Sequence, residues 1–283
     1  MSCSASGNAS RIHNNREAES AIMNNMNKSW EKLFSKAMMT LEKGNWLKAV
    51  QYLRRSCELY PCQVDAHYEL ADIYLELGHL DAALEIVQQA LAIDPLNFSC
   101  NFLLGNIYLA QGNIRDALKI YLYLEKISDD SSPELLFNIA TAFDYRGDKK
   151  KALHYAVYAT EDDPSFIEAY ELTGKLLLEK MDLDGAKKVF REILSIEPCH
   201  VNAHHMLGVI YAKEHRLLEA IREWEGVLAV APEADETLRE MGCTLNLLGD
   251  GERAVRLLHR ALEINPENVQ ARIDLRRVLQ INT

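Results

Sequence analysis

A period of 34 residues is the feature that most constrains what this chain can fold into. The seven prolines stand at positions 61, 95, 133, 164, 198, 232 and 266, and most intervals between them are 34 residues long. The two irregular intervals, of 38 and 31 residues, adjoin Pro133 and mark a local change. Self-similarity at this spacing is typical of a helical repeat array, in which each unit stacks on its neighbours.

Rows of 34 residues that begin at positions 30, 64, 98, 133, 167, 201 and 235 align particular residue types at fixed positions, here called slots. The eighth slot holds only alanine or glycine: Ala37, Ala71, Gly105, Ala140, Gly174, Gly208 and Gly242. The twentieth slot is alanine in every row: Ala49, Ala83, Ala117, Ala152, Ala186, Ala220 and Ala254. A turn residue lies between these two slots. It is a glycine in five rows, Gly44, Gly78, Gly112, Gly147 and Gly249, and it is Met181 in row five and His215 in row six. Large apolar side chains recur at the eleventh and twenty-fourth slots, for example Tyr108 and Trp224.

These slots predict two antiparallel helices in each row. Small side chains at slots eight and twenty let the two backbones approach closely, and the large side chains fill the space towards the next pair. The glycine ends the first helix in a left-handed conformation, and the proline follows the second helix. One such hairpin cannot bury its own apolar face, so the array depends on stacking for its stability.

This pattern of small, aromatic, glycine, alanine, aromatic and proline positions resembles the tetratricopeptide repeat family from residue 30 to residue 268. The resemblance implies an all-α fold, a right-handed α-solenoid of seven helix–turn–helix repeats. The repeats are predicted at 30–63, 64–97, 98–132, 133–166, 167–200, 201–234 and 235–268, followed by a capping helix at 269–283. We expect the apolar face of that capping helix to consist of Val269, Ile273 and Val278 or Leu279. Residues 1–29 are predicted to be a disordered or partly helical N-terminal extension.

Two rows and one loop depart from the family pattern. The first row has Thr40 where an aromatic residue is usual. The fourth row has Lys149 at a usually apolar position and only Ala156 at slot twenty-four, which predicts a loosely packed second helix. In the stretch KISDDSSPELL (126–136), one residue is inserted and Asp129 stands where proline is expected. This seam is interpreted either as a loop variant that shifts the local pitch, or as a hinge or phosphorylatable loop.

Charge and hydropathy exclude several classes of partner. The formal net charge of −11 disfavours nucleic acid and anionic membrane surfaces. No apolar run approaches the roughly 20 residues that a membrane-spanning helix needs, and the N-terminus has no apolar core typical of a secretion signal. The six cysteines show no disulfide-like spacing, which predicts reduced thiols and a cytoplasmic location.

The resemblance implies that slots two, five, nine and twelve of the first helices face the concave side of the superhelix, here called the groove. The fifth slot reads Phe34, Tyr68, Phe102, Phe137, Glu171, His205 and Arg239, so aromatics occupy repeats one to four and polar groups the rest. The predicted partner-binding residues are Phe34, Met38, Tyr68, Asp72, Phe102, Asn106, Leu109, Phe137, Thr141, Asp144, Glu171 and Lys175. Such an apolar groove with an acidic edge suits a partner segment with apolar anchors and basic flanks.

Two simpler explanations compete with a binding groove. The fifth-slot aromatics could fold against the neighbouring helix and complete the core, and the second-slot acids sit at helix N-termini, where the helix dipole favours them. The segregation of the aromatics to repeats one to four favours a binding site, because a purely structural need would have spread them evenly. Some family members capture a carboxylate with lysine and arginine on the first helices. Those cations are absent here, since the corresponding positions are Phe34, Met38, Asn106, Asn138, Glu168 and Leu172.

No catalytic or cofactor motif stands out. His200 and His204 have the i, i+4 spacing of a metal pair but no evident carboxylate partner, so neither a metal nor a cofactor is predicted. The sequence therefore favours a non-catalytic interaction scaffold, adaptor or assembly chaperone that binds a partner peptide or helix. An alternative is a self-assembling protein, a homo-oligomer in which residues 16–29 dock in a neighbour's groove; an enzyme that uses the histidine cluster is a third hypothesis.

Overall fold

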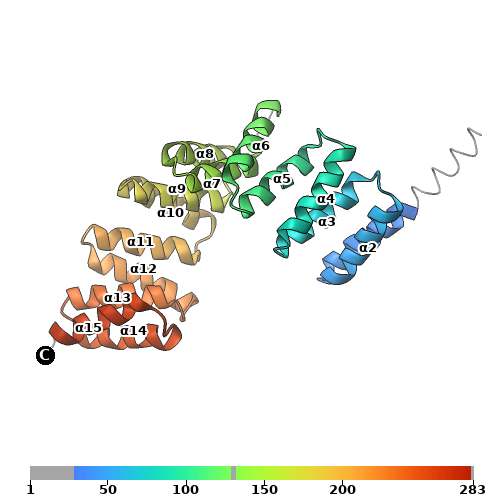
Figure 1. Cartoon of the computed structure of the whole chain (residues 1–283). Helices are drawn as coiled ribbons and strands as arrows, with labels where there is room; N and C mark the ends of the chain where they lie inside the picture. Colours follow the sequence, from blue (N-terminus) through green and yellow to red (C-terminus); the bar gives the residue numbers. More distant parts are fainter. Residues whose placement is uncertain (1–28, 129–131, 282–283) are drawn as a thin grey trace, which may run out of the picture. The chain divides into compact units, whose positions relative to one another are not determined.

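The computed structural model describes residues 29–128 and 132–281, and every regular element in these two stretches is an α-helix. A first helix covers 29–42. The remaining helices are α2 (Trp46–Leu59), α3 (Val64–Glu76), α4 (Leu80–Ile93), α5 (Phe98–Ala110), α6 (Ile114–Ile127), α7 (Pro133–Tyr145), α8 (Lys149–Asp162), α9 (Ile167–Glu179), α10 (Leu183–Ile196), α11 (Val201–Lys213), α12 (Leu217–Val230), α13 (Asp235–Leu247), α14 (Gly251–Ile264) and α15 (Val269–Ile281). They form antiparallel hairpins (Figure 1).

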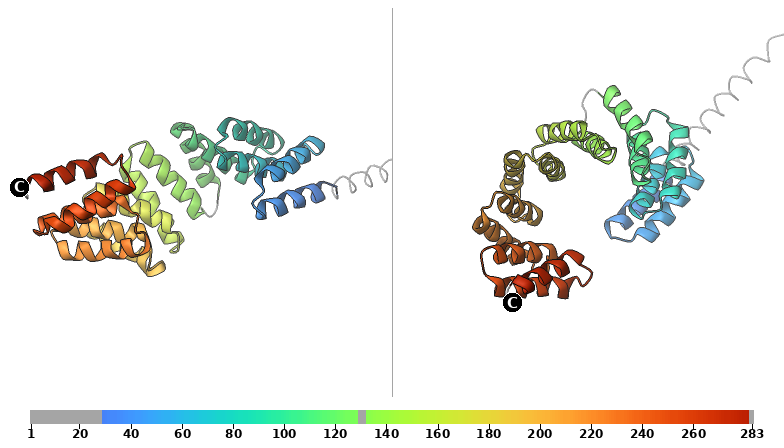
Figure 2. Two further views of the ribbon diagram at one scale, coloured as in Figure 1. Left: turned by 90° about the horizontal axis from the view of Figure 1, so that it is seen from below. Right: turned by 60° about the vertical axis from the view of Figure 1, so that its left-hand side comes forward.

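The chain forms two compact units that divide between Ser131 and Ser132, here called the N-unit and the C-unit. In the C-unit, the helix pairs from α7 to α15 stack one after another along a curved row (Figure 2). Three predicted features lie wholly or almost wholly outside the described residues: the extension at 1–29, the docking segment at 16–29 and the centre of the seam at 129–131. They remain predictions.

The turn inside each hairpin has the left-handed conformation that the glycine pattern predicts. Gly44, Gly78, Gly112, Gly147 and Gly249 all have positive φ angles. The two rows without glycine keep the same geometry, with φ of 63° at Met181 and 60° at His215. In most hairpins the next residue is an asparagine or aspartate whose side chain accepts a hydrogen bond from a backbone N–H in the first turn of the second helix, as Asp148 does. The position in the hairpin therefore decides the conformation, even where the residue is not glycine.

Glycine at slot eight is explained by the size of its neighbour at slot twenty-four. A Cβ atom on Gly105 would lie 2.4 Å from the ring of Tyr121, and one on Gly208 would lie 2.3 Å from the indole of Trp224. Where the neighbour is smaller, as with Val87, slot eight is an alanine and both residues are fully buried. The predicted close approach of the two helices is thus confirmed, and the two slots are matched in volume.

The prediction of a loosely packed second helix in the fourth repeat is wrong. Ala152, Ala156 and Ala159 of α8 are all completely buried. Phe143 of α7 supplies the bulk that α8 lacks, since its ring stacks on Tyr155 with the ring centroids 5.5 Å apart. Short side chains on α8 therefore allow a close approach of α7 rather than a gap.

The predicted apolar face of the last helix is also largely wrong. Val269 is 62% exposed, and Ile273 and Leu279 are exposed as well. Helix α15 instead buries Ala271, Leu275 and Val278, together with one charged residue, Asp274. The buried face includes Asp274, which pairs with Arg239 of α13 at 3.0 Å, while Ile273 before it faces outwards.

Candidate partner-binding surface

The fifth-slot residues form a series along the first helices, here called the ladder, and its aromatic members are all half-buried. Phe34 stacks on Trp30 with ring centroids 5.2 Å apart. Phe102 lies 6.4 Å from Phe98 and 5.9 Å from Tyr121, measured between ring centroids. Each ring therefore shares part of its surface with the core and leaves part of it on the outside. The core explanation is confirmed in part, and the binding role stays a prediction.

Phe137 is the aromatic ladder residue of the C-unit. Its ring contacts Phe166, just before α9, at a centroid distance of 5.2 Å, and it packs against the buried cluster of Leu136, Ala159 and Ala169. The remaining part of the ring lines a pocket, described below. This half-buried position explains why a large aromatic occurs off the main apolar stripe of α7.

The polar ladder residues of the C-unit each bind the following helix hairpin. Glu171 of α9 accepts a hydrogen bond from the side-chain amide of Asn202 in α11. His205 Nδ1 of α11 lies 2.8 Å from Oγ1 of Thr237 in α13. Burial lowers the pKa of His205. The same slot that supplies an aromatic contact at Phe102 and Phe137 thus supplies a hydrogen bond between repeats at Glu171 and His205.

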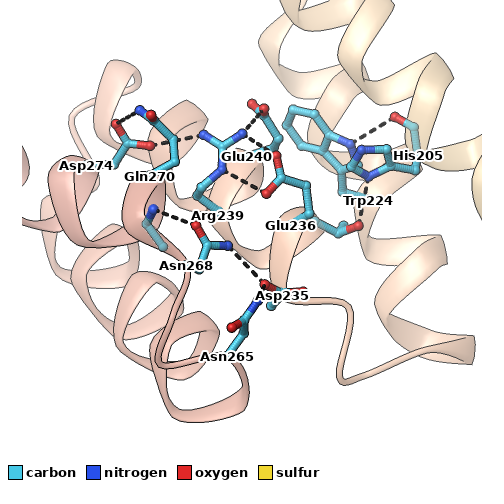
Figure 3. A network of polar contacts seen from close by, with 12 residues as sticks. His205, Trp224, Asp235, Glu236, Arg239, Glu240, Asn265, Asn268, Gln270 and Asp274 are labelled. Atoms are coloured by element: carbon cyan, nitrogen blue, oxygen red, sulfur yellow. Dashed lines mark hydrogen bonds and ion pairs between the residues drawn. The ribbon is translucent and has the colours of Figure 1, made fainter.

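Arg239 of α13 ends the ladder with a dense network of charges (Figure 3). Its side chain, which is only 12% exposed, donates to Asp274 of α15 at 3.0 Å, and to Glu236 and Glu240 of its own helix. Hydrogen bonds from Arg239 lower the pKa of Glu236 and raise the pKa of Arg239 itself. The network therefore attaches the last helix to the body of the C-unit.

A second part of this network holds the loop before α15. Asn265 and Asn268 donate their side-chain amides to the carboxylate of Asp235 at 3.0 Å and 2.9 Å (Figure 3). Burial by itself would raise the pKa of Asp235, but these hydrogen bonds more than compensate and lower it. Arg239 is thus fully used within the protein and leaves no free positive charge for a ligand.

The inner side of the C-unit contains a pocket of about 550 Å³ between α7, α9 and α11. It is lined by Phe137, Thr141, Asp144, Tyr145, Glu168, Glu171, Leu172, Lys175, Leu178, Glu179, Phe190, Asn202 and Met206. Five of the twelve predicted partner-binding residues are among them: Phe137, Thr141, Asp144, Glu171 and Lys175. The structure thus brings together all the predicted residues of the C-unit.

Asp144 is the most buried acid of this pocket, since its side chain is only 5% exposed. It pairs with Lys149 of α8 at 2.5 Å and with Lys175 of α9 at 2.9 Å. Lys149 also reaches Glu179 of α9 at 2.7 Å. Burial by itself would raise the pKa of Asp144, but the two lysines lower it. Asp144 is therefore a structural centre that connects three helices, which no spacing in the sequence indicated.

The other seven predicted residues belong to the N-unit and are half-buried: Phe34, Met38, Tyr68, Asp72, Phe102, Asn106 and Leu109. Asn106 accepts a hydrogen bond from the hydroxyl of Tyr121 at 2.7 Å, which gives this asparagine a structural role. The pKa of Asp72 is raised by burial and by repulsion from Glu76. Burial raises the pKa of Glu69 in the same way, with Asp72 and Asp65 adding to it.

These four acids form one stripe along α3, at positions 65, 69, 72 and 76. None of them has a hydrogen bond or ion pair with another side chain in the stretches that the structure describes. The inner side of the N-unit thus combines half-buried aromatics with uncompensated negative charge.

The histidine cluster has different partners from those expected. His204 Nδ1 lies 2.7 Å from Glu223 of α12 and its Nε2 lies 3.0 Å from the carbonyl oxygen of Pro198. His200 accepts a hydrogen bond from the backbone N–H of Ala203 and lies 3.8 Å from Glu171. The expectation that no carboxylate is near these histidines is therefore wrong, but within the described residues no three His, Cys, Asp or Glu side chains converge as a metal site would need.

Sequence reasoning missed several lining residues of the pocket. Leu172 and Met206 occupy the sixth slot, which the sequence analysis considered only for carboxylate capture. Tyr145 and Glu179 occupy the thirteenth, which the family pattern does not assign to the groove. One signal was available, because Leu172 and Met206 lie at equivalent positions of consecutive rows. Their exposure depends on the curvature of the row of helices, which periodicity alone does not give.

An array of antiparallel helix hairpins with matched small and large slots defines the class of protein: an all-α repeat solenoid. A family model described as tetratricopeptide repeat matches residues 40–97 and 78–136. Residues 40–136 thus match the tetratricopeptide repeat family, and the described residues as a whole have the fold of a tetratricopeptide repeat solenoid.

Known proteins resemble this chain over part of their length. Human protein O-mannosyl-transferase TMTC3 is 35% identical over 107 residues, which is 38% of this chain and 12% of that protein. Anaphase-promoting complex subunit 3 of Schizosaccharomyces pombe is 25% identical over 148 residues, which is 52% of this chain and 22% of that protein. The chain thus spans less than a quarter of the length of these relatives.

Two solved structures share the fold. A crystal structure of the APC/C hetero-tetramer Cut9–Hcn1 has a TM-score of 0.68 at 16% identity, and covers 86% of this chain and 48% of that chain. A tetratricopeptide repeat protein from Parabacteroides merdae has a TM-score of 0.64 at 18% identity, and covers 89% and 99% of the two chains. Among the described residues of our chain, no helix is both long and apolar enough to cross a membrane.

Proposed function

We propose that this protein is a non-catalytic interaction scaffold, acting as an adaptor or assembly chaperone, which binds a peptide or helix of a partner on the inner side of its first helices. The observation that carries the proposal is the pocket between α7, α9 and α11, which combines an apolar wall with carboxylates. Pockets that hold a ligand segment are typically apolar with a few charged groups that fix its orientation.

The contrast along the ladder supports this location. His205 and Arg239 are occupied by hydrogen bonds within the C-unit. Phe137, in contrast, leaves part of its ring on the pocket surface. A rigid surface that already has its final shape loses little conformational entropy when a partner binds.

The relatives are consistent with a scaffold. Two of the matches carry the name of the anaphase-promoting complex, one as a subunit and one as a hetero-tetramer, so similar repeats occur in multi-protein assemblies. We extend to this chain only the general role of holding proteins together. Its partner, and its action as a chaperone or an adaptor, are for experiment to identify.

Comparison of two arginine substitutions tests the proposal. Leu172→Arg places a long charged side chain in the pocket, whereas Leu218→Arg places one at an exposed position of α12, where the leucine is 63% exposed. Both variants and the unmodified chain are used as baits in an affinity capture, followed by mass spectrometry. We expect Leu172→Arg to lose proteins that Leu218→Arg and the unmodified chain retain.

Circular dichroism melting of both variants provides the folding control. If a folded Leu172→Arg protein captures the same proteins as the unmodified chain, the pocket is not the binding surface and the proposal is wrong.

We also propose that the protein works in the cytoplasm. The five cysteines in the described stretches are free thiols, including the exposed Cys62 and Cys199. Exposed free thiols suit a reducing compartment. Imaging of the tagged full chain in cells tests this, and a signal confined to an oxidising compartment would contradict it.

A further inference from the structure

The pocket of the C-unit is lined by four carboxylates, those of Asp144, Glu168, Glu171 and Glu179, but not all of their charge is available to a ligand. Asp144 and Glu179 are compensated by Lys149 and Lys175, which pair with them at 2.5–2.9 Å. Two acids and two lysines thus cancel. The uncompensated charge of the pocket comes from the remaining two glutamates.

Glu168 and Glu171 lie on the same side of α9, three residues apart, at the second and fifth slots. Glu171 is bound to the neutral amide of Asn202, and Nε2 of His200 lies 3.8 Å from its carboxylate. Glu168 is exposed, and no lysine or arginine of the described stretches lies within ion-pair distance of either carboxylate. Like charges at this spacing repel each other and destabilise a helix slightly.

The helix dipole explains the presence of only one of the two glutamates. Glu168 lies in the first turn of α9, where the dipole favours a negative charge. Glu171 lies beyond the first turn, where this effect has faded. The pair is therefore not explained by the stability of α9 alone.

Apolar side chains surround the two glutamates on three helices. Phe137 comes from α7, Leu172 from α9 and Met206 from α11, and all three are half-buried lining residues of the pocket. A lysine or arginine side chain matches such a site well, because its aliphatic stem can pack on apolar groups while its charged head reaches the carboxylates. Arginine fits best, since its planar guanidinium can bond two carboxylates and stack on an aromatic ring.

We propose that this pocket recognises an arginine next to an apolar residue in a segment of a partner protein. The guanidinium binds between Glu168 and Glu171, and the neighbouring apolar side chain packs against Phe137, Leu172 and Met206. The inference rests on the proposed scaffold function and gives it a ligand chemistry. It also predicts that acidic segments are rejected by repulsion from the same two carboxylates.

The test uses three fluorescein-labelled libraries of random twelve-residue peptides. Each library has a leucine at one central position, and the residue beside it is arginine, lysine or glutamate; the other positions are uncharged. Binding to the full chain is measured by fluorescence anisotropy at fixed, near-physiological salt, because charge-dependent binding weakens as salt rises. We expect the arginine library to bind at least tenfold more tightly than the glutamate library, and more tightly than the lysine library.

A charge reversal identifies the site. The double variant Glu168→Lys with Glu171→Lys should lose the preference for arginine and bind the glutamate library instead. The matched control is Glu161→Lys with Glu225→Lys, which changes the net charge equally at two exposed positions on second helices. This control should keep the preference for arginine.

Three results would overturn the inference in distinguishable ways. If the arginine and glutamate libraries bind equally and Leu172→Arg abolishes both, the pocket binds peptides without this chemistry, and the proposed function stands. If the arginine preference survives charge reversal, the basic segment binds elsewhere on the chain. If no library binds the unmodified chain more tightly than it binds the Leu172→Arg variant, the arginine site is wrong. The affinity capture described above then decides the proposed function separately.

Discussion

The N-unit and the last three repeats of the C-unit, α9 to α14, use the same slot of the repeat in opposite ways. In the N-unit, Phe102 at the fifth slot contacts the rings of Phe98 and Tyr121. In the C-unit, His205 and Arg239 at the fifth slot bond to Thr237 and Asp274 of the following first helices. The backbone of the hairpins is alike in both units. The comparison teaches that the repeat specifies where a side chain lies, and that residue type then decides between apolar packing and polar bonding.

The acids of the inner side follow the same division. In the N-unit, Glu69 and Asp72 have raised pKa values, because they are partly buried and close to other acids. In the C-unit, Asp144, Asp235 and Glu236 have lowered pKa values, because lysine, asparagine or arginine side chains bond to them. Glu69 and Asp72 of the N-unit thus lack partners that offset their burial, whereas Asp144, Asp235 and Glu236 of the C-unit have them.

The largest effect is expected from breaking the polar end of the ladder. Arg239→Met should lower the free energy of unfolding by about 3 kcal/mol, because the buried Asp274 then loses its closer cation and keeps only the amide of Gln270 and the exposed Arg277. Urea denaturation measures the loss, and hydrogen exchange should show it in α15. Arg277→Met is the matched control, since that side chain is 69% exposed and pairs with the same Asp274 at 3.6 Å; a change of less than about 0.5 kcal/mol is expected there.

A second substitution shows whether the network is needed for its charge. The double variant Arg239→Met with Asp274→Leu should recover most of the loss, because no buried charge is then unpaired. If the double variant is less stable than Arg239→Met, the network stabilises the protein by more than the pairing of a buried charge.

The aromatic end of the ladder should be less sensitive. Phe102→Ala should cost about 1–2 kcal/mol, below the 3–5 kcal/mol of a fully buried aromatic, because the ring is half-buried. Trp224→Ala, in which a completely buried side chain is removed, provides the upper reference. If Phe102→Ala lowers the free energy of unfolding as much as Trp224→Ala, the aromatic ladder residues belong to the core. The contrast between the two units would then give no argument for a binding surface.

Substitutions in the hairpin turns should change the free energy of unfolding by about 1 kcal/mol. All the described turns of the N-unit have glycine, and Gly78→Ala should be destabilising by about 1 kcal/mol, because φ at this position is +74°. In the C-unit, Met181→Gly should raise stability by up to about 1 kcal/mol, since methionine holds a φ of 63° there.

Gly226 provides the control for these turn substitutions. It lies inside α12 with open space around its Cβ position, so Gly226→Ala should be stabilising by about 1 kcal/mol. Thermal or urea denaturation checks all three. A stabilising Gly78→Ala would mean that the left-handed turn is not maintained in solution.

The smallest effect concerns pH, and its sign differs between the units. Glu69 and Asp72 have raised pKa values, so the native N-unit binds more protons than the unfolded chain between about pH 4 and the raised values. Its stability therefore rises as the pH falls through this range. Asp144, Asp235 and Glu236 have lowered pKa values, so the stability that they give the C-unit is present above about pH 4 and is lost below it.

Hydrogen exchange, corrected for its intrinsic pH dependence, measures how the stability of each unit changes with pH. Opening free energies in α3 should increase as the pH falls towards about 4, while those in α7 stay constant until below about pH 4. Glu69→Gln with Asp72→Asn should remove the dependence in α3. The same slope in both units would contradict the division of their charges.

The repeat pattern was sufficient to predict the hairpins, because each slot is a local requirement. A left-handed turn between two helices favours glycine. The same turn occurs at Met181 and His215, where only the spacing predicted it. Glycine at slot eight faces a large side chain at slot twenty-four, and both positions repeat with the period of the backbone. Such features depend on contacts within one hairpin or with its immediate neighbour.

The partners of the charged residues were decided only by the tertiary structure. Lys149, which appeared to be a defect in the fourth repeat, pairs with Asp144 and Glu179 from two different helices. Val269 and Ile273 appeared to be the buried face of the last helix, yet Asp274 is buried instead because Arg239 lies opposite. Long side chains can reach several neighbours, so their pairing depends on helix orientation rather than on period. For the same reason the pocket beside Leu172 and Met206 emerged only when three first helices were placed side by side.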